Sequence, residues 1–392
     1  MKNLSLDVAN LLILKKQYLT EDTKNDNILQ ITDDLCGLHA TETIVPYLTL
    51  FARTVHFEKE DLDTHLFIEK NLGKIRGMRK TLFIETKKMI PIVHNSIKSQ
   101  TNKRDEQYLE MREISIDEYN TLSNQILDIL INKEMSTTEI KNVLSSQKDI
   151  VAMISVMCDK MLLIRGKPIK SWKDRRNLYA PFDNYFPNIN LNKYNQEEAI
   201  NLLIQKYIKS YGPVTLNDIT WWLQVNKYQA KKVLLSLEGQ TEPLKIDTLD
   251  LDYIICKDDI IKMMESNSQT KKIINFLPRL DPYLMGYKDR ERYVHLKDYE
   301  YIFDRSGNAT STILSNGRVI GIWDEVEKPV PLLKLFLFKK TTEDVLEKIL
   351  VEGKKIGKFI TKRDVDIKIC EEMIPLTKRT MGGFMSPLKD CT

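Results

Sequence analysis

The 392-residue chain lacks several features that would assign it to a protein class at once. Its five cysteines (Cys36, Cys158, Cys256, Cys370 and Cys391) are scattered, and none forms a CxxC pair. This pattern fits a reducing compartment and argues against a disulfide framework or a zinc ribbon. No apolar run reaches the roughly 18 residues of a membrane-spanning helix, and the N-terminal stretch lacks the pattern of a secretory signal. We therefore expect a soluble, cytoplasmic protein.

Motifs for metals and nucleotides are also missing. There is no HExxH, no Cys/His cluster and no carboxylate spacing that suggests a metal site. The stretch EGKKIGK at 352–358 lacks the spacing of a phosphate-binding Walker loop, and SNGRVIG at 315–321 is typical of a hairpin rather than a dinucleotide fingerprint. We expect neither a metal nor a cofactor.

The overall composition is that of an ordinary globular protein. Hydrophobic residues make up 42% of the chain and charged residues 29%, and the net charge is only +4. The length allows two to four modules. Local clusters of charge are therefore more informative than the total.

Internal similarity is the most useful feature that the sequence does have. The segments 126–167 and 203–246 both begin with a helix of apolar period, continue through a capped second helix and a third helix, and end in a strand. Ser136 is the expected cap in the first segment and Thr215 in the second, where Asp218 occupies the third helical position. Three helices followed by a β-hairpin is the winged-helix plan.

The sequence predicts an α+β protein with three tandem winged-helix units and a C-terminal β-rich, barrel-like module. The units are expected at 1–100, 101–190 and 191–262, with the polar stretch 98–118 as the link between the first two. The module at 263–392 contains an Asn-Gly pair within SNGRV, the strongest short hairpin signal, and a closing helix at 341–352.

Basic residues gather on the two predicted wings. The stretch 160–176 has seven basic residues and one acid, and a phosphate backbone attracts such a wing; a solvated lysine-rich loop is the alternative. The first wing repeats the pattern more weakly around Met78, which we expect to be buried. The predicted DNA contacts are Lys74, Arg76, Arg79, Lys80, Arg165, Lys167, Lys170, Trp172, Lys173, Arg175 and Arg176.

A polar and aromatic loop near residue 280 is a further candidate. Asp281, Tyr283, Tyr287 and Arg290 could line a pocket, or Asp281 and Pro282 could be ordinary turn residues.

Several stretches, taken in order, resemble the AlkZ/YcaQ-type winged-helix family, which includes bacterial DNA glycosylases. They are CGLHATETIVPYLTLFART, IRGMRKTLFIE, YGPVTLNDITWWL, LPRLDPYLMGYKDR and DRSGNATSTILSNGRVIGIW, spread over about 35–340. The resemblance implies a scaffold that clasps duplex DNA and cleaves the N-glycosidic bond of alkylated purines, including some crosslinks, without metal or cofactor. The family's catalytic motif, glutamine-any residue-glutamine, corresponds here to His39-Ala40-Thr41.

His39, Thr41 and the following Glu42 are therefore the predicted catalytic residues. A neutral imidazole and a hydroxyl can hold a water, and a carboxylate suits a developing sugar cation. Side chains two apart diverge on a helix, so the site requires a non-helical kink, for which Gly37 is suggestive. The alternative is that Thr41 caps a helix beginning near Glu42.

Three functions remain open at this point. The first is a monomeric, monofunctional glycosylase acting on alkylated or bulky-adduct purines in double-stranded DNA. The second is a non-catalytic winged-helix DNA-binding protein, such as a transcriptional regulator or a lesion sensor. A protein-interaction scaffold is a third, less specific possibility.

Overall fold

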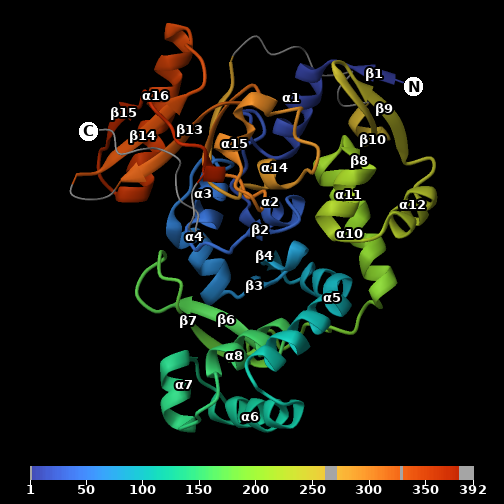
Figure 1. Cartoon of the computed structure of the whole chain (residues 1–392), viewed down its shortest axis with the longest axis vertical. Helices are drawn as coiled ribbons and strands as arrows, with labels where there is room; N and C mark the ends of the chain where they lie inside the picture. The colour runs from blue at the N-terminus through green and yellow to red at the C-terminus, as the bar shows by residue number, and fades with distance from the viewer. Residues whose placement is uncertain (1, 261–271, 327–329, 379–392) are drawn as a thin grey trace. The chain divides into compact units, whose positions relative to one another are not determined.

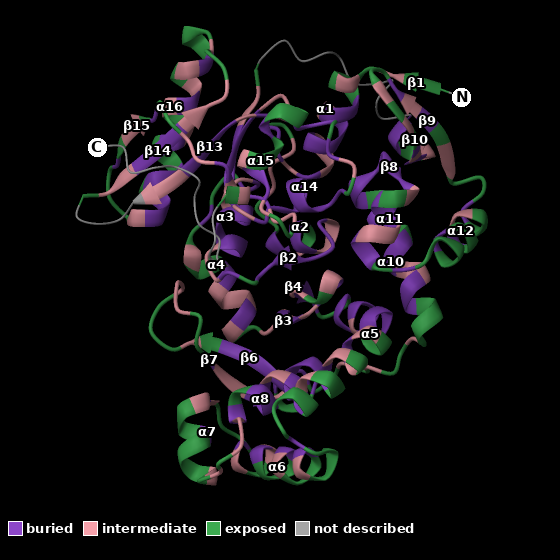
Figure 2. Ribbon diagram, viewed as in Figure 1, coloured by how far each residue is buried: buried purple, intermediate pink, exposed green. Residues whose placement is uncertain are grey.

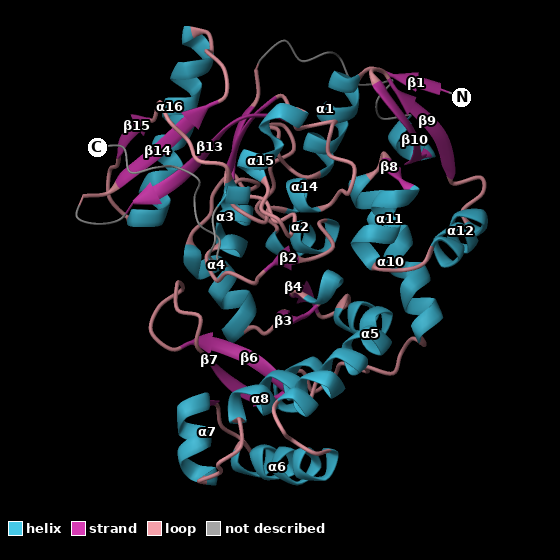
Figure 3. Cartoon of the chain, viewed as in Figure 1, coloured by secondary structure: helices cyan, strands magenta, loops and turns pink. Residues whose placement is uncertain are grey.

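The computed structural model of the chain describes residues 2–260, 272–326 and 330–378 (Figure 1). The described residues form many helices and three sheets, none of them closed (Figure 3). Contacts group the chain into two compact units: unit 1 is 1–27, 47–57 and 207–392, and unit 2 is 28–46 and 58–206. These units cut across the four predicted segments, whose boundaries stay a prediction.

Unit 2 contains the first basic wing, the predicted catalytic motif and the helices and hairpin of the second predicted unit, called the second repeat below. Its helices and strands are α2 Ile28–Asp34, β2 Leu38–His39, α4 Lys59–Asp63, η1 Thr64–Ile68, β3 Leu72–Arg76, η2 Met78–Lys80, β4 Leu82–Thr86, α5 Ile90–Met111, α6 Ile116–Ile129, β5 Met135–Ser136, α7 Thr137–Leu144, α8 Ile150–Asp159, β6 Leu163–Pro168, β7 Asn177–Pro181 and α9 Phe182–Tyr185. Helices α3 Val45–Phe51 and α10 Gln196–Tyr211 each contain a boundary between the units.

The strands of unit 2 form one six-stranded sheet in the order β2-β4-β3-β6-β7-β5. The two predicted wings, β3–β4 and β6–β7, join within this sheet where Lys74 pairs with Arg165. Strand β2 is an edge strand whose Leu38 and His39 pair with Ile84 and Phe83 of β4. The two wings are therefore parts of one surface rather than separate projections.

The second repeat follows the predicted order of helix, helix, helix and hairpin. Ser136 caps α7 by accepting the Glu139 backbone N–H, and the Glu139 carboxylate accepts the Ser136 backbone N–H in return. Helix α8 buries Met153, Val156 and Met157 in the core of this part, whereas α7 is largely exposed (Figure 2). This arrangement leaves α8 too enclosed to enter a DNA groove.

The stretch 98–118, predicted to link the first two units, is helical over most of its length. Helix α5 continues to Met111, and Ser115 then caps α6 directly. Asp105 and Leu109 are buried on α5, and Arg104 of the same helix donates at 2.9 Å to the carboxylate of Asp159 at the end of α8. The polar sequence did not indicate this packing, because the partner of Arg104 lies 55 positions further along the chain.

Unit 1 contains the C-terminal module and the helices and hairpin of the third predicted unit, called the third repeat below. Besides parts of α3 and α10, its elements are β1 Lys2–Leu4, α1 Leu6–Lys16, β8 Val214–Thr215, α11 Leu216–Leu223, α12 Lys227–Ser236, β9 Thr241–Ile246, β10 Leu249–Cys256, β11 Ile274–Leu277, α14 Pro282–Met285, η3 Leu296–Asp298, α15 Tyr299–Ile302, β12 Thr312–Ser315, β13 Arg318–Val326, β14 Leu332–Leu337, α16 Glu343–Thr361, β15 Asp366–Ile369 and η4 Leu376–Lys378.

The third repeat again shows helix, helix, helix and hairpin, from α10 to β10. Thr215 caps α11 and Asp218 completes the capping box, as predicted. The hairpin belongs to a four-stranded sheet, β1-β9-β10-β8, in which the N-terminal strand β1 runs parallel to β9. The start of the chain is thus built into the third repeat.

The C-terminal module is an open five-stranded sheet, β11-β12-β13-β14-β15, so the strands that the structure describes do not form the predicted barrel. The Asn-Gly hairpin is present: Asn316 and Gly317 have φ values of 47° and 77°, as a type I′ turn requires. Helix α16 packs on the sheet, where a Cβ on Gly353 would lie 3.0 Å from Ile367 and 3.2 Å from Leu333.

Among the cysteines that the structure describes, Cys36, Cys158 and Cys256 are free thiols, and Cys370 is disulfide-bonded. The sequence did not predict that disulfide. No helix among the described residues is long and apolar enough to cross a membrane.

Candidate functional site

The segment from Cys36 to Glu42 leaves the helix sharply, which provides the kink that the catalytic motif requires. Helix α2 ends at Asp34, Cys36 has φ 55° and Gly37 has φ 93°, and the chain then forms β2. A positive φ is strained for residues with a Cβ, so Gly37 is the residue that allows this turn. Helix α3 begins only at Val45, so Thr41 does not cap a helix that starts near Glu42.

His39 is buried, with 3% of its surface exposed, and its ring lies 5.1 Å from that of Phe83. Its Nδ1 is enclosed and has no hydrogen-bond partner among the described residues. Burial lowers the pKa of His39 to about 3, and the positive charge of Arg79 acts in the same direction. The imidazole is therefore neutral near pH 7: it can orient a water by hydrogen bonding, but it is too weakly basic to deprotonate one readily.

Thr41 and Glu42 differ in their environments. Thr41 is exposed, whereas Glu42 is buried and its carbonyl accepts the Val45 backbone N–H at 3.4 Å. The hydroxyl of Thr41 is thus accessible to a ligand without rearrangement.

Glu85 is a residue near the motif that the sequence did not single out. It is fully buried on β4, and a Cβ on Gly37 would lie 2.6 Å from its Cδ. Neither carboxyl oxygen has a hydrogen-bond partner within the described part of the chain. Because Phe83 pairs with His39, the register places Glu85 on the same sheet face as His39.

The environment of the Glu85 carboxyl group favours its neutral form. Burial raises its pKa well above the usual value, and Asp33 adds to this effect, while Lys206 opposes it. Lys206 forms ion pairs with Asp33 at 2.6 Å and Asp34 at 3.1 Å. A carboxyl group with a raised pKa and a neutral imidazole therefore lie on one face at the edge of the sheet, each with a polar atom that has no hydrogen-bond partner among the described residues, a pattern found at functional sites.

The base of the second wing is a buried charge cluster. Asp159 is fully buried and forms ion pairs with Arg76 at 2.7 Å, Arg104 at 2.9 Å and Arg165 at 3.7 Å. Arg165 is itself buried, and Asp105 pairs with Arg104 at 3.0 Å. Two of the predicted DNA contacts, Arg76 and Arg165, thus hold the sheet and helices of unit 2 together in this structure.

The first wing is also less exposed than its sequence suggests. Lys74 is half-buried, and burial lowers its pKa to about 8, with Arg165 as the next cause. Met78 is fully buried, as expected. Arg79 is half-buried and Lys80 is exposed, and both have positive φ values in the turn.

The tip of the second wing is the loop between β6 and β7, which projects from the sheet (Figure 1). Lys167, Lys170 and Arg175 are exposed there, and Trp172 and Lys173 are half-buried, with the Lys173 ammonium 5.5 Å from the Trp172 ring. Arg176 is exposed but pairs with Asp174 at 2.9 Å. The predicted DNA contacts are thus divided between a solvated tip and a buried base.

Helix α12 is a basic surface that the sequence analysis did not single out. Lys227, Lys231 and Lys232 are exposed on it, and Tyr228 is 78% exposed. It is the third helix of its repeat, the position that enters the major groove in helix-turn-helix proteins. The repeat pattern together with KYQAKK could have identified it.

The candidate loop at 281–290 is packed inside unit 1. Asp281 is fully buried and pairs with both Nη atoms of Arg53, at 2.9 and 2.8 Å. Tyr283 and Tyr287 are buried and donate to the carbonyl groups of Gly317 and Tyr211. The Arg290 guanidinium is also buried, 3.7 Å from the centroid of the Phe303 ring. These four side chains have structural partners within unit 1.

No group of three or more His, Cys, Asp or Glu side chains in the described ranges could hold a metal ion.

Comparisons with known proteins relate this arrangement to a family. The family model described as DNA glycosylase AlkZ-like matches residues 32–359. The DNA glycosylase AlkZ of Streptomyces sahachiroi has the same fold, with a TM-score of 0.76 at 16% identity over 94% of this chain and 100% of that one. An interstrand DNA cross-link repair glycosylase of the same organism is 22% identical over 134 residues, 34% of this chain and 36% of that relative. Because the family model covers most of the 392 residues, the chain belongs to the AlkZ-like DNA glycosylase family.

Proposed function

We propose that the protein is a monofunctional DNA glycosylase that removes alkylated or bulky-adduct purines from double-stranded DNA, including crosslinked ones. In this proposal the repeats at 116–181 and 196–256 are winged-helix units, and the protein acts as a monomer. The observation that carries the proposal is His39, which lies in a non-helical segment and has a buried Nδ1 with no hydrogen-bond partner among the described residues. The family resemblance assigns this position to the catalytic motif.

Cleavage of the N-glycosidic bond of an alkylated purine needs little acid catalysis from the protein. A purine alkylated at N7 or N3 is cationic and is already a good leaving group, so the enzyme must orient a water and stabilise a cationic sugar. A neutral His39 supplies a hydrogen bond to that water, and Thr41 supplies a second one. Glu42 follows directly in the chain and is our candidate for the negative charge that faces the sugar.

Glu85 is assigned to positioning in this mechanism. Its neutral carboxyl group packs against Gly37, the residue at which the chain turns into β2. An ionised carboxylate there would be costly to bury without a partner, so the neutral form supports the segment that carries His39.

DNA binding is assigned to the solvated basic groups. Lys167, Lys170 and Arg175 at the tip of the second wing, and Lys227 and Lys231 on α12, are exposed and suited to phosphate contacts. Arg76 and Arg165 are excluded from this role because their guanidinium groups pair with the buried Asp159.

Single-turnover base release from a duplex with one N7-alkylguanine tests the proposal. We expect His39→Ala to lower the rate about 100-fold or more, since one hydrogen-bonding group at the reacting centre contributes on that order. His39→Gln is expected to retain measurable activity because it restores a carboxamide at the motif position. His56→Ala is the control, since this imidazole is 87% exposed and bound only to Asp26.

DNA affinity is measured in parallel at fixed low salt. Loss of base release with unchanged affinity and an unchanged unfolding curve supports a catalytic His39. Salt-sensitive binding by the wild type without release from any N7-alkylguanine duplex would overturn the glycosylase proposal and favour a non-catalytic DNA-binding protein. Release unaffected by His39→Ala removes His39 from the mechanism.

A further inference from the structure

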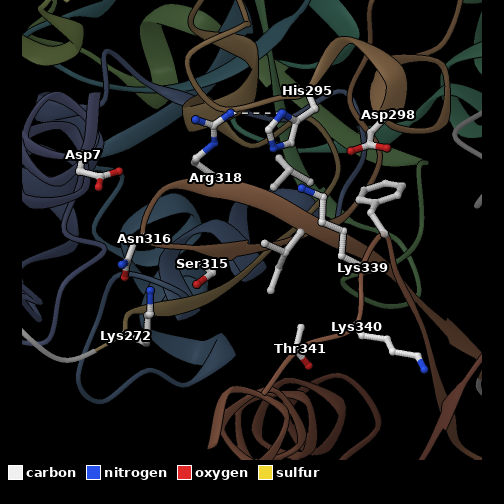
Figure 4. A pocket seen from close by; sticks show the side chains of 13 residues that line it. Asp7, Lys272, His295, Asp298, Ser315, Asn316, Arg318, Lys339, Lys340 and Thr341 are labelled. Atoms are coloured by element: carbon white, nitrogen blue, oxygen red, sulfur yellow. Dashed lines mark hydrogen bonds between the residues drawn. The ribbon is translucent and has the colours of Figure 1, made fainter. Parts of the chain in front are cut away.

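Unit 1 contains a cavity of about 300 Å³ that no part of the proposed mechanism uses. It lies between the β12–β13 hairpin and residues 338–341, which follow β14 (Figure 4). This volume is at the lower end of the range for small-molecule sites. It is enough for one nucleotide-sized group.

The lining of the cavity is mainly basic. Lys272, Arg318, Lys339 and Lys340 contribute four positive charges, whereas Asp7 and Asp298 contribute two negative ones. The cavity therefore favours an anionic ligand.

Two of these cations converge on one imidazole. The Arg318 Nη2 lies 3.4 Å from His295 Nδ1, and Figure 4 shows the Lys339 side chain pointing towards the same ring while Lys340 points away. Within the part of the chain that the structure describes, neither Arg318 nor Lys339 forms an ion pair. Two like charges that share no ion-paired carboxylate repel each other, so the cluster is suited to binding an anion.

The imidazole responds to this positive potential. Burial lowers the pKa of His295, and Arg318 and then Lys339 lower it further, while Asp298 acts in the opposite direction. His295 is therefore neutral near pH 7 and able to donate a hydrogen bond to a ligand.

Hydrogen bonds fix the β12–β13 turn that borders the cavity. Asn316 Oδ1 accepts the Ile273 backbone N–H at 2.9 Å, and the Tyr283 hydroxyl donates to the Gly317 carbonyl at 2.7 Å. Arg318 follows this type I′ turn directly, so its backbone is fixed by contacts from two other segments of unit 1. A preorganised cation loses less entropy on binding than one in a mobile loop.

The wall beside the cations is apolar. Val319, Ile320 and Phe338 lie next to Arg318 and Lys339 in the lining. A bare inorganic ion would leave this wall unused, whereas a sugar or base attached to the phosphate would pack against it.

We propose that this cavity binds a phosphate group carried on a nucleoside, with Arg318 and Lys339 on the phosphate and the Phe338 side on the sugar or base. The nucleotide can be free or part of a nucleic-acid strand, because the same chemistry recognises both. The assignment does not depend on glycosylase activity.

Nuclear magnetic resonance of the His295 ring in the full-length protein tests the proposal. Inorganic phosphate and deoxyadenosine 5′-monophosphate are titrated in turn, and each is expected to raise the pKa of His295 in a saturable way. The nucleotide is expected to bind more tightly than the ion because it also covers the apolar wall.

Two variants and a matched control identify the contacts. Arg318→Gln and Lys339→Gln should each weaken nucleotide binding by about tenfold, since each removes a charge-assisted hydrogen bond. Lys354→Gln removes the same charge from an exposed position on α16 outside the cavity and should change the affinity less than about twofold.

The outcomes are distinct. A short DNA duplex that displaces the nucleotide identifies a strand as the source, and failure to displace it identifies a free nucleotide; both support the site. Absence of a saturable change at His295, or equal affinity in Arg318→Gln and the wild type, overturns it. Base release measured on the same variants separates this result from the glycosylase proposal.

Discussion

The two ends of the β6–β7 hairpin have similar basic sequences but contrasting environments. At its base, Arg165 is buried and shares Asp159 with Arg76 and Arg104. At its tip, Lys167, Lys170 and Arg175 are exposed to solvent. A count of charges along the sequence treats all of these residues alike, although only the tip has charge available to a partner.

The contrast also separates two kinds of ion pair. At the base, carboxylates and guanidinium groups have lost their water and depend on one another, so the removal of one member leaves buried charge behind. At the tip, Asp174 pairs at 2.9 Å with Arg176, whose side chain is 61% exposed, so water can solvate this arginine if its partner is removed. Stability should therefore depend on the base, and DNA affinity on the tip.

The largest expected effect is on folding. Asp159→Asn removes the carboxylate shared by three arginines and should lower the free energy of unfolding by about 3–5 kcal/mol. Urea denaturation measures the change.

The matched control is Asp174→Asn, the same substitution in a pair whose arginine is exposed. It should lower the free energy of unfolding much less than Asp159→Asn does. Equal destabilisation by the two variants would contradict the distinction between base and tip.

The next effect is on DNA binding. The triple variant Lys167→Gln, Lys170→Gln, Arg175→Gln should weaken binding to any duplex by about 10- to 100-fold near 0.1 M salt. It should also reduce the slope of log K against log salt by about 2–3, close to one per lost phosphate contact. Fluorescence anisotropy over a series of salt concentrations gives both quantities.

Unfolding curves for the triple variant should match those of the wild type, because none of the three side chains is buried. An unchanged salt slope would place the phosphate contacts elsewhere, with α12 as the next surface to test.

The last prediction concerns how the stability of the protein depends on pH. Burial raises the pKa of Asp105 from 3.8 to about 7, and Asp159 adds to this, while Arg104 opposes it. The folded state then holds a proton that the unfolded state releases, so this group's contribution to stability is present below about pH 4 and is lost as the pH rises towards 7. Asp105→Asn keeps the neutral form, so its stability relative to the wild type should increase from pH 4 to pH 8.

Urea denaturation of both proteins at a series of pH values gives that difference. A constant difference across this range would mean that Asp105 is ionised throughout in the folded protein.

Much of the fold could be predicted because its signals are local. The Ser136 and Thr215 caps and the Asn316-Gly317 hairpin depend on residues within a few positions of one another, and the structure contains all three. Helix α5 was missed because its polar residues gain partners from elsewhere in unit 2. The predicted barrel is not confirmed among the described strands, because hydrophobic alternation predicts strands but does not determine whether a sheet closes.

The candidate site was predicted less completely for the same physical reason. The kink at Gly37 was anticipated from the spacing of His39 and Thr41, but the burial of His39 and its lowered pKa depend on Phe83 and Arg79, which lie 44 and 40 positions later. Glu85 carried no signal in the sequence, because its significance comes from pairing of β2 with β4. Contacts between distant strands supply what local patterns cannot.

Because the two wings join at Lys74 and Arg165, the sheet of unit 2 fixes the lateral distance between His39 and the basic tip. His39 lies on edge strand β2, and the basic tip begins at the end of β6, three strands away in the order β2-β4-β3-β6. At about 4.8 Å per strand, the sheet separates them laterally by roughly 14 Å. Since nucleotides along one strand of duplex DNA are spaced by about 3.4 Å, this corresponds to roughly four base pairs. Backbone contacts made by the tip would then hold the duplex in a register that brings a nucleotide about four steps away to His39.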